Sequence, residues 1–82
     1  MIPRVIITKN GKQVASARNL EVLSRYHRTK GYVTKSTAKK LPDGRGLLSV
    51  YFSDGARCQD VWSDYETLRD WLATKRKRSG WR

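Results

Sequence analysis

The sequence predicts one small α+β domain, and three observations lead to this prediction. The chain has 82 residues, which is enough for a single domain with a modest core. Short stretches rich in β-branched and aromatic residues alternate with glycine-containing turns, as in antiparallel sheets. Two other stretches carry apolar residues at helical spacing. We therefore expect the order β-β-α-β-β-β-α over residues 1–77, with both helices packed on one face of an antiparallel sheet, followed by a flexible basic tail at 78–82.

The turns define the expected strands. Asn10-Gly11 accepts two successive positive φ angles and predicts a tight type I′ hairpin between residues 5–9 and 12–16. Turn sequences at 42–44 and 53–55 separate three further strands, which should form an antiparallel meander. These strands are expected at 32–41, 47–52 and 56–62.

Capping residues define the expected helices. Asn19 can cap a first helix that continues to about Lys30, where Gly31 would supply a left-handed stop. Residues 63–66 read Ser-Asp-Tyr-Glu, a capping box in which the serine and the glutamate each satisfy a free backbone amide. The second helix should continue to about Lys77, and its packing side is Tyr65, Leu68, Trp71 and Leu72.

One face of the predicted sheet remains free, because both helices cover the other. A three-residue loop at 53–55 would pair Phe52 with Ala56. The same register pairs Val50 with Cys58, and all four side chains then point to the core. The free face would receive Lys35, Thr37, Lys39, Ser49, Tyr51, Arg57 and Gln59.

The charge pattern indicates a polyanionic partner. The chain carries 18 Lys and Arg against 7 Asp and Glu, for a net charge of +11. Residues 1–42 sum to +9, residues 43–74 to −3 and residues 75–82 to +5. Two basic blocks around an acidic segment favour a phosphate backbone as the partner.

The free face has the side chains that nucleic-acid binding requires. Lys35, Lys39 and Arg57 can neutralise phosphates and release counterions. Arg57 and Gln59 can also contact guanine or adenine edges, and Tyr51 can stack on an unpaired base. The alternative is a solvated sheet face on which lysines discourage edge pairing.

Two further basic regions are candidates. Four consecutive cations end the second helix, more than the helix dipole alone explains, and with the following tryptophan they suggest a basic arm with one stacking aromatic. Its residues are Lys75, Arg76, Lys77, Arg78 and Trp81. The exposed side of the first helix forms a secondary basic surface of Arg18, Arg25, Arg28 and Lys30. Glu66 and Asp70 would keep phosphate away from the outer face of the second helix.

No enzyme, metal site or cofactor is predicted. His27, the only histidine, falls on the apolar side of its helix, and Cys58, the only cysteine, has an inward strand position without an activating partner. One cysteine and one histidine cannot form a structural zinc site. Residues 1–4 lack a long apolar run and no stretch is long enough to span a membrane, so we expect a cytoplasmic protein.

The layout of residues 32–77, with Trp62 at the junction of the last strand and the helix, resembles the three-stranded-sheet DNA-binding domains of plant AP2 factors and of phage integrase arm-binding domains. Those domains read the major groove with the sheet, and the resemblance implies this role for Lys35, Lys39, Tyr51 and Arg57. From the first helix onward, the order α-β-β-β-α equally resembles a double-stranded-RNA-binding domain. The layout therefore assigns the chain to no family.

The leading hypothesis is a small non-enzymatic nucleic-acid-binding protein, with DNA slightly favoured over RNA, of the kind found in bacteria, phages and mobile elements. The alternative is a small phage-type regulator or inhibitor that docks on an acidic host protein. Arg25, Arg28 and the basic tail would form that docking surface.

Overall fold

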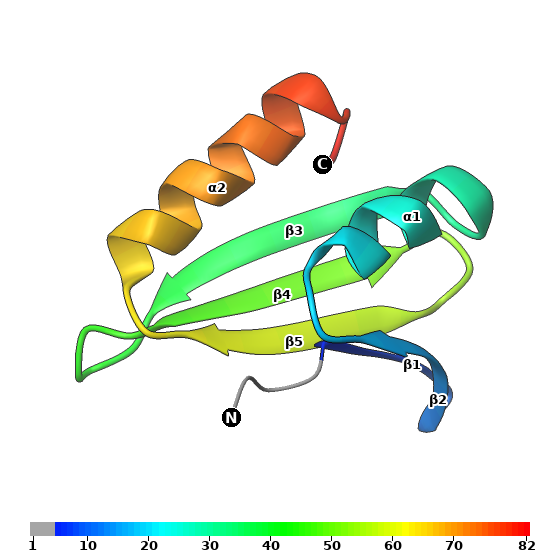
Figure 1. Ribbon diagram of the computed structural model, residues 1–82, viewed down its shortest axis with the longest axis horizontal. Helices are drawn as coiled ribbons and strands as arrows, with labels where there is room; N and C mark the ends of the chain where they lie inside the picture. Colours follow the sequence, from blue (N-terminus) through cyan, green and yellow to red (C-terminus); the bar gives the residue numbers. More distant parts are fainter. Residues whose placement is uncertain (1–4) are drawn as a thin grey trace.

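The computed structural model describes residues 5–82 and confirms the predicted α+β class and order of elements. The elements are β1 (Val5–Lys9), β2 (Lys12–Ala17), α1 (Glu21–Thr29), β3 (Val33–Lys40), β4 (Gly46–Phe52), β5 (Arg57–Trp62) and α2 (Tyr65–Arg78). Both helices lie on the same side of one sheet (Figure 1). The start of the domain that we predicted at residue 1 lies outside the described residues.

The five strands form a single antiparallel sheet in the order β2-β1-β5-β4-β3. Within the meander of β3, β4 and β5, the last two strands have the predicted register: the Phe52 amide donates to the Ala56 carbonyl at 2.9 Å, and Val50 pairs with Cys58. The Asn10-Gly11 turn has φ angles of 53° and 78°, as a type I′ hairpin requires. That hairpin joins the meander through β1, so β5 becomes the central strand.

The core lies between the sheet and the two helices. It contains inward side chains from four strands, together with residues of both helices and the C-terminus: Val5, Ile7, Val22, Leu23, Tyr26, Val33, Leu48, Val50, Phe52, Ala56, Cys58, Leu68, Leu72 and Trp81. α2 crosses very close to the start of β4. A Cβ atom on Gly46 would lie only 2.8 Å from Leu68 Cδ2 and 3.1 Å from Tyr65 Cα. Glycine is therefore required there for packing.

The ends of α1 differ from the predicted caps. Leu20 is the residue before the helix and has helical φ and ψ angles, while the Asn19 side chain still accepts a hydrogen bond from the Glu21 amide at 3.0 Å. The left-handed stop predicted at Gly31 is wrong, since Gly31 does not have a positive φ angle. Space is tight at this position, because a Cβ atom there would lie 3.1 Å from Asp54 Cγ.

The cap of α2 lies one residue later than predicted. Asp64 has an extended backbone, and its carboxylate accepts hydrogen bonds from the Thr67 amide at 2.9 Å and the Thr67 hydroxyl at 2.8 Å. These two bonds lower the pKa of Asp64. Glu66 pairs with Arg69 at 2.7 Å, so Ser63 and Glu66 do not form the expected capping box.

The C-terminal residues are folded against the domain, which corrects the prediction of a free arm. Gly80 has a φ angle of +72° and lies between the end of α2 and Trp81, whose side chain is only 3% exposed. The Trp81 ring packs edge-on against Trp71, with 5.4 Å between centroids. The Ser36 hydroxyl then donates to the carbonyl oxygen of Arg82 at 2.7 Å. A buried Trp81 has no free ring face for a nucleic-acid base.

Candidate nucleic-acid interface

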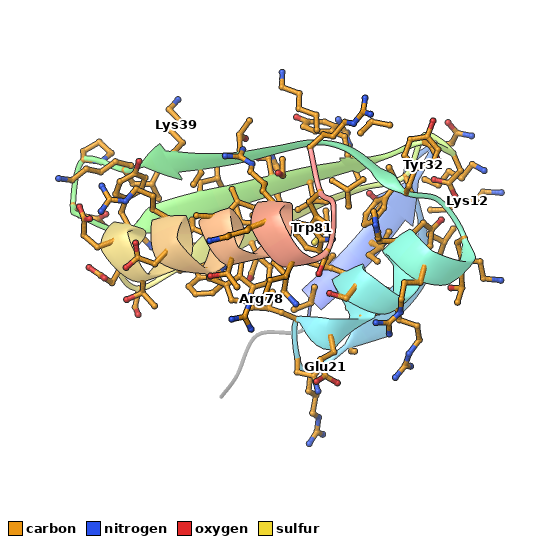
Figure 2. All side chains as sticks on the ribbon, turned by 90° about the horizontal axis from the view of Figure 1, so that it is seen from above. Lys12, Glu21, Tyr32, Lys39, Arg78 and Trp81 are labelled. Carbon is orange, nitrogen blue, oxygen red and sulfur yellow. The ribbon has the colours of Figure 1, made fainter. Side chains whose placement is uncertain are left out.

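The side of the sheet that the helices leave uncovered is named the open face here. It carries all seven side chains that the register predicted for it. In Figure 2, Lys39 projects away from both helices, whereas Arg78 lies on the helical side. Strand pairing assigns the following residues to the open face: Ile6, Thr8, Gln13, Ser16, Lys35, Thr37, Lys39, Leu47, Ser49, Tyr51, Arg57, Gln59 and Val61.

A β-bulge at the start of β3 sets this arrangement. Val33 pairs with Phe52 and Lys35 pairs with Tyr51, so β3 has one extra residue, Thr34, between these two pairs. The bulge allows Val33 to face the core while Lys35 faces outward, although the two residues are separated by an even number of positions. Without it, either a lysine would be buried or a valine exposed.

The aromatic row is a line of side chains that crosses all five strands. Lys35 pairs with Tyr51, Tyr51 with Arg57, Arg57 with Thr8, and Thr8 with Gln13. Directly opposite side chains in an antiparallel sheet have Cβ atoms about 5 Å apart. The Tyr51 ring is therefore flanked by a cation on each neighbouring strand.

Two further rows lie parallel to the aromatic row. The polar row contains Thr37, Ser49 and Gln59, and the Gln59 side-chain amide donates to the Ser49 hydroxyl at 3.4 Å. The third row has one cation and two apolar side chains: Lys39, Leu47 and Val61. The open face thus changes from cationic and aromatic at one end to largely apolar at the other.

The three cations of the open face are free of acidic partners. None of its positions carries Asp or Glu, and within residues 5–82 Lys35, Lys39 and Arg57 make no ion pair. The nearest acids along the strands are engaged elsewhere. Asp54 accepts from the Tyr26 hydroxyl on the helical side, and Asp60 faces the helices. An anionic ligand could therefore approach the open face without meeting a carboxylate.

Two shallow hollows lie on the open face, and Arg57 borders both. One, of about 340 Å³, lies between the β1–β2 and β4–β5 turns and is lined by Thr8, Asn10, Gly11, Tyr51, Gly55 and Arg57. The other, also about 340 Å³, is lined by Ile6, Thr8, Arg57 and Gln59. Their shared guanidinium group is placed to reach an anion in either hollow.

The end of α2 does not extend this site. Lys75 Nζ donates to the Ser24 hydroxyl at 3.1 Å and lies 5.6 Å from the Trp71 ring centroid. The Arg76 guanidinium group donates to the hydroxyl and to the carbonyl oxygen of Ser36. These two cations fasten α2 to α1 and β3. Of the five tail residues that the sequence nominated, Trp81 is buried and Lys75 is half-buried, whereas Arg76, Lys77 and Arg78 are exposed.

The secondary basic surface lies apart from the open face. Arg25, Arg28 and Lys30 are exposed on and just after α1, and Arg18 is exposed just before it. Because α1 packs on the helical side of the sheet, these cations and the open face cannot both contact one short straight nucleic acid.

Sequence reasoning missed several open-face residues. Ile6 and Thr8 were not assigned to the face because the partner strand of β1 was unknown. Val61 could have been found, since it shares strand parity with Arg57 and Gln59. A second exposed aromatic, Tyr32, precedes β3 at the same end of the sheet as Tyr51; it is 59% exposed, and its carbonyl accepts from the Ser53 amide at 2.8 Å.

Cys58 and His27 are both held within the packing of the domain. Burial, with the nearby charge of Asp60, raises the pKa of the Cys58 thiol to about 11. His27 Nδ1 accepts a hydrogen bond from the Val33 amide at 2.8 Å, which ties α1 to the start of β3. In the described part of the chain, no three His, Cys, Asp or Glu residues are grouped to hold a metal ion. Nor does any helix between residues 5 and 82 have the length and apolar character to cross a membrane.

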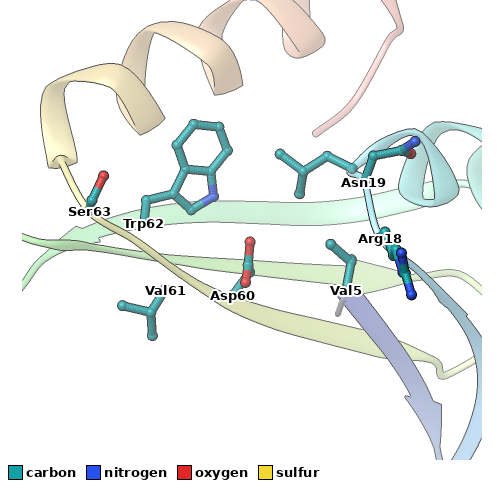
Figure 3. Close-up of a pocket in the computed structure, with 8 residues that line it drawn as sticks. Val5, Arg18, Asn19, Asp60, Val61, Trp62 and Ser63 are labelled. Atoms are coloured by element: carbon teal, nitrogen blue, oxygen red, sulfur yellow. The ribbon is translucent and has the colours of Figure 1, made fainter. Parts of the chain in front are cut away.

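A separate pocket of about 360 Å³ lies on the helical side, where β5 meets the residues before α1 (Figure 3). Val5, Leu20 and Trp62 supply apolar walls, and Asp60 supplies a carboxyl group whose pKa burial raises. The Trp62 indole N–H is buried without a hydrogen-bond partner in the described residues. None of the three cations of the open face lines this pocket.

Comparison with protein-family models, with curated proteins and with solved structures gave no significant match.

Proposed function

We propose that the protein is a small non-enzymatic nucleic-acid-binding protein that uses its open face. The observation that carries this proposal is the placement of Lys35, Lys39 and Arg57 on one face without an acidic residue. Cations whose only role was solubility could be paired with carboxylates or spread over all surfaces. Three cations on the face that carries Tyr51, two of them directly beside its ring, instead suit a ligand that has both phosphates and bases.

The size of the electrostatic contribution follows from the number of phosphate contacts. Three contacts predict a slope of about −2 for log affinity against log salt with a single strand, and about −2.7 with B-DNA. For a single strand, the affinity should then fall roughly 20-fold between about 50 and 200 mM salt. Binding without this salt dependence would not use the cations of the open face.

Two double variants with equal charge test which surface binds. Lys35→Gln with Lys39→Gln removes two cations from the open face, and Arg25→Gln with Arg28→Gln removes two from α1. Titration by fluorescence anisotropy should use short single-stranded DNA, single-stranded RNA and duplexes of both. The lysine pair should lower affinity and bring the single-strand salt slope to about −0.7. The arginine pair should change affinity by less than about twofold.

Several results would contradict the proposal. Absence of binding to every nucleic acid at low salt would exclude the function. Equal loss of affinity in the two double variants would show that net charge matters and the open face does not.

A protein partner is the second candidate, and one surface favours it. A groove of about 230 Å³ beside α1 is mainly apolar, is bordered by Arg25 and Lys30, and includes Val14, which is 46% exposed. An acidic protein could bury Val14 and pair with the arginines of α1. A stoichiometric partner in nuclease-treated lysate that the arginine pair loses and the lysine pair retains would support this function.

We further propose a cytoplasmic location. This location is supported by Cys58, a free and buried thiol that suits a reducing compartment.

A further inference from the structure

The shape and composition of the open face distinguish between forms of nucleic acid. We propose that the open face binds a single strand, which crosses the sheet along the aromatic row with one base stacked on Tyr51. This inference rests on the proposed function and specifies its ligand.

The width of the sheet disfavours insertion into duplex DNA. Neighbouring strands lie about 4.8 Å apart, so five strands span roughly 19 Å. The major groove of B-DNA is about 12 Å wide and admits one helix or a two-stranded ribbon. Arg57 lies on β5, the central strand, with two strands on each side. The strands on either side of β5 would meet the phosphate backbones before Arg57 reached a base edge.

The aromatic row provides what an unpaired nucleotide needs. Tyr51 is 37% exposed, and its direct neighbours across the strands are Lys35 and Arg57. A base stacked on the phenol ring places its own phosphate or the next one within reach of one of these cations. Tyr32, exposed at the same end of the sheet, offers a second ring for an adjacent base.

The apolar residues of the open face point to the same ligand. Ile6 is 40% exposed and Val61 is 47% exposed, and both lie on the face that carries the cations. A duplex hides the faces of its bases in the stack and presents phosphates, sugars and base edges. A single strand presents its base faces, which can cover Ile6, one open-face position from Thr8 of the aromatic row; Val61 lies two rows away.

Tyr51 variants test the proposal. Binding of a fluorescein-labelled oligothymidylate, an oligouridylate of equal length and a DNA hairpin duplex should be measured at about 50 mM salt. For at least one single strand, wild type should bind more tightly than it binds the duplex. Tyr51→Ala should weaken that single-strand binding by about 5- to 140-fold, the equivalent of one lost base stack. Tyr51→Phe keeps the ring and should remain within about twofold of wild type.

The controls separate this inference from the proposed function and from misfolding. Far-UV circular dichroism and thermal unfolding should show that both Tyr51 variants fold like wild type. Tighter binding to the duplex, or equal binding of Tyr51→Ala and wild type to single strands, would overturn the single-strand proposal while the proposed function stands. Absence of binding to all three probes would overturn both.

Discussion

Replacement of Trp81 by alanine should cost the domain about 3 kcal/mol of stability. A buried tryptophan removes roughly 150–250 Å² from water, which corresponds to about 4–6 kcal/mol at 25 cal/mol per Å². Part of this gain is already offset, because the indole N–H is buried without a partner among the described residues and such a group costs about 1–3 kcal/mol. A domain of 82 residues has a total stability of about 4–12 kcal/mol. The loss would therefore be a large fraction of the whole.

Urea unfolding followed by far-UV circular dichroism measures this loss without depending on tryptophan fluorescence. With a slope of about 1 kcal/mol per molar urea, the midpoint of Trp81→Ala should fall by roughly 3 M, or the variant should be partly unfolded in water. Trp81→Phe keeps a ring and removes the unpartnered N–H, so it should cost less than about 1.5 kcal/mol. Lys77→Ala, an exposed change in the same segment, should stay within about 0.5 kcal/mol. A Trp81→Ala stability within 0.5 kcal/mol of wild type would refute the packing argument and restore the free arm.

Three further changes test other contacts. Gly46→Ala should destabilise by about 1–3 kcal/mol in urea unfolding, because the new Cβ would collide with Leu68; an unchanged midpoint would contradict the close approach of α2. Asp64→Ala should cost about 1 kcal/mol through loss of the cap on the Thr67 amide, whereas Ser63→Ala should be nearly neutral; the reverse order would favour the capping box. Burial and the hydrogen bond to Asp54 raise the pKa of Tyr26 to about 12 from its ordinary value of 10. The associated stability is present below pH 10 and lost as pH rises towards 12, so wild type should lose its advantage over Tyr26→Phe across that range; a constant difference would exclude this linkage.

The register of the meander could be predicted because it depends on local geometry. A three-residue loop at 53–55 fixes which residues of β4 and β5 are opposite, and alternation then assigns Tyr51 and Arg57 to one face. The assignment of β3 was right for a less secure reason. Lys35, Thr37 and Lys39 do lie on the open face, but this placement depends on a bulge at Thr34 that the sequence did not indicate.

Features that depend on long-range packing were not predictable in the same way. Both edges of the meander were available to the first hairpin, and nothing near Ile7 in the sequence specifies that it pairs with Cys58. The tail was interpreted as a basic arm from its four consecutive cations and the tryptophan that follows them. The signal for its true position was Gly80, a residue suited to a positive φ angle at a helix end, followed by an aromatic side chain that can pack back on the core.

The position of β1 has a consequence for the order in which the domain folds. β3, β4 and β5 are joined by short turns, whereas the pairing of Ile7 with Cys58 closes a loop that contains most of the chain. Closure of a long loop costs entropy before its contacts form, so β1 should dock after the meander, and Ile7→Val should mainly speed unfolding. The aromatic row would then be complete only after the meander has formed, when Thr8 pairs with Arg57. A ligand that spans this seam would bind only the finished sheet and would thereby slow the detachment of the first hairpin.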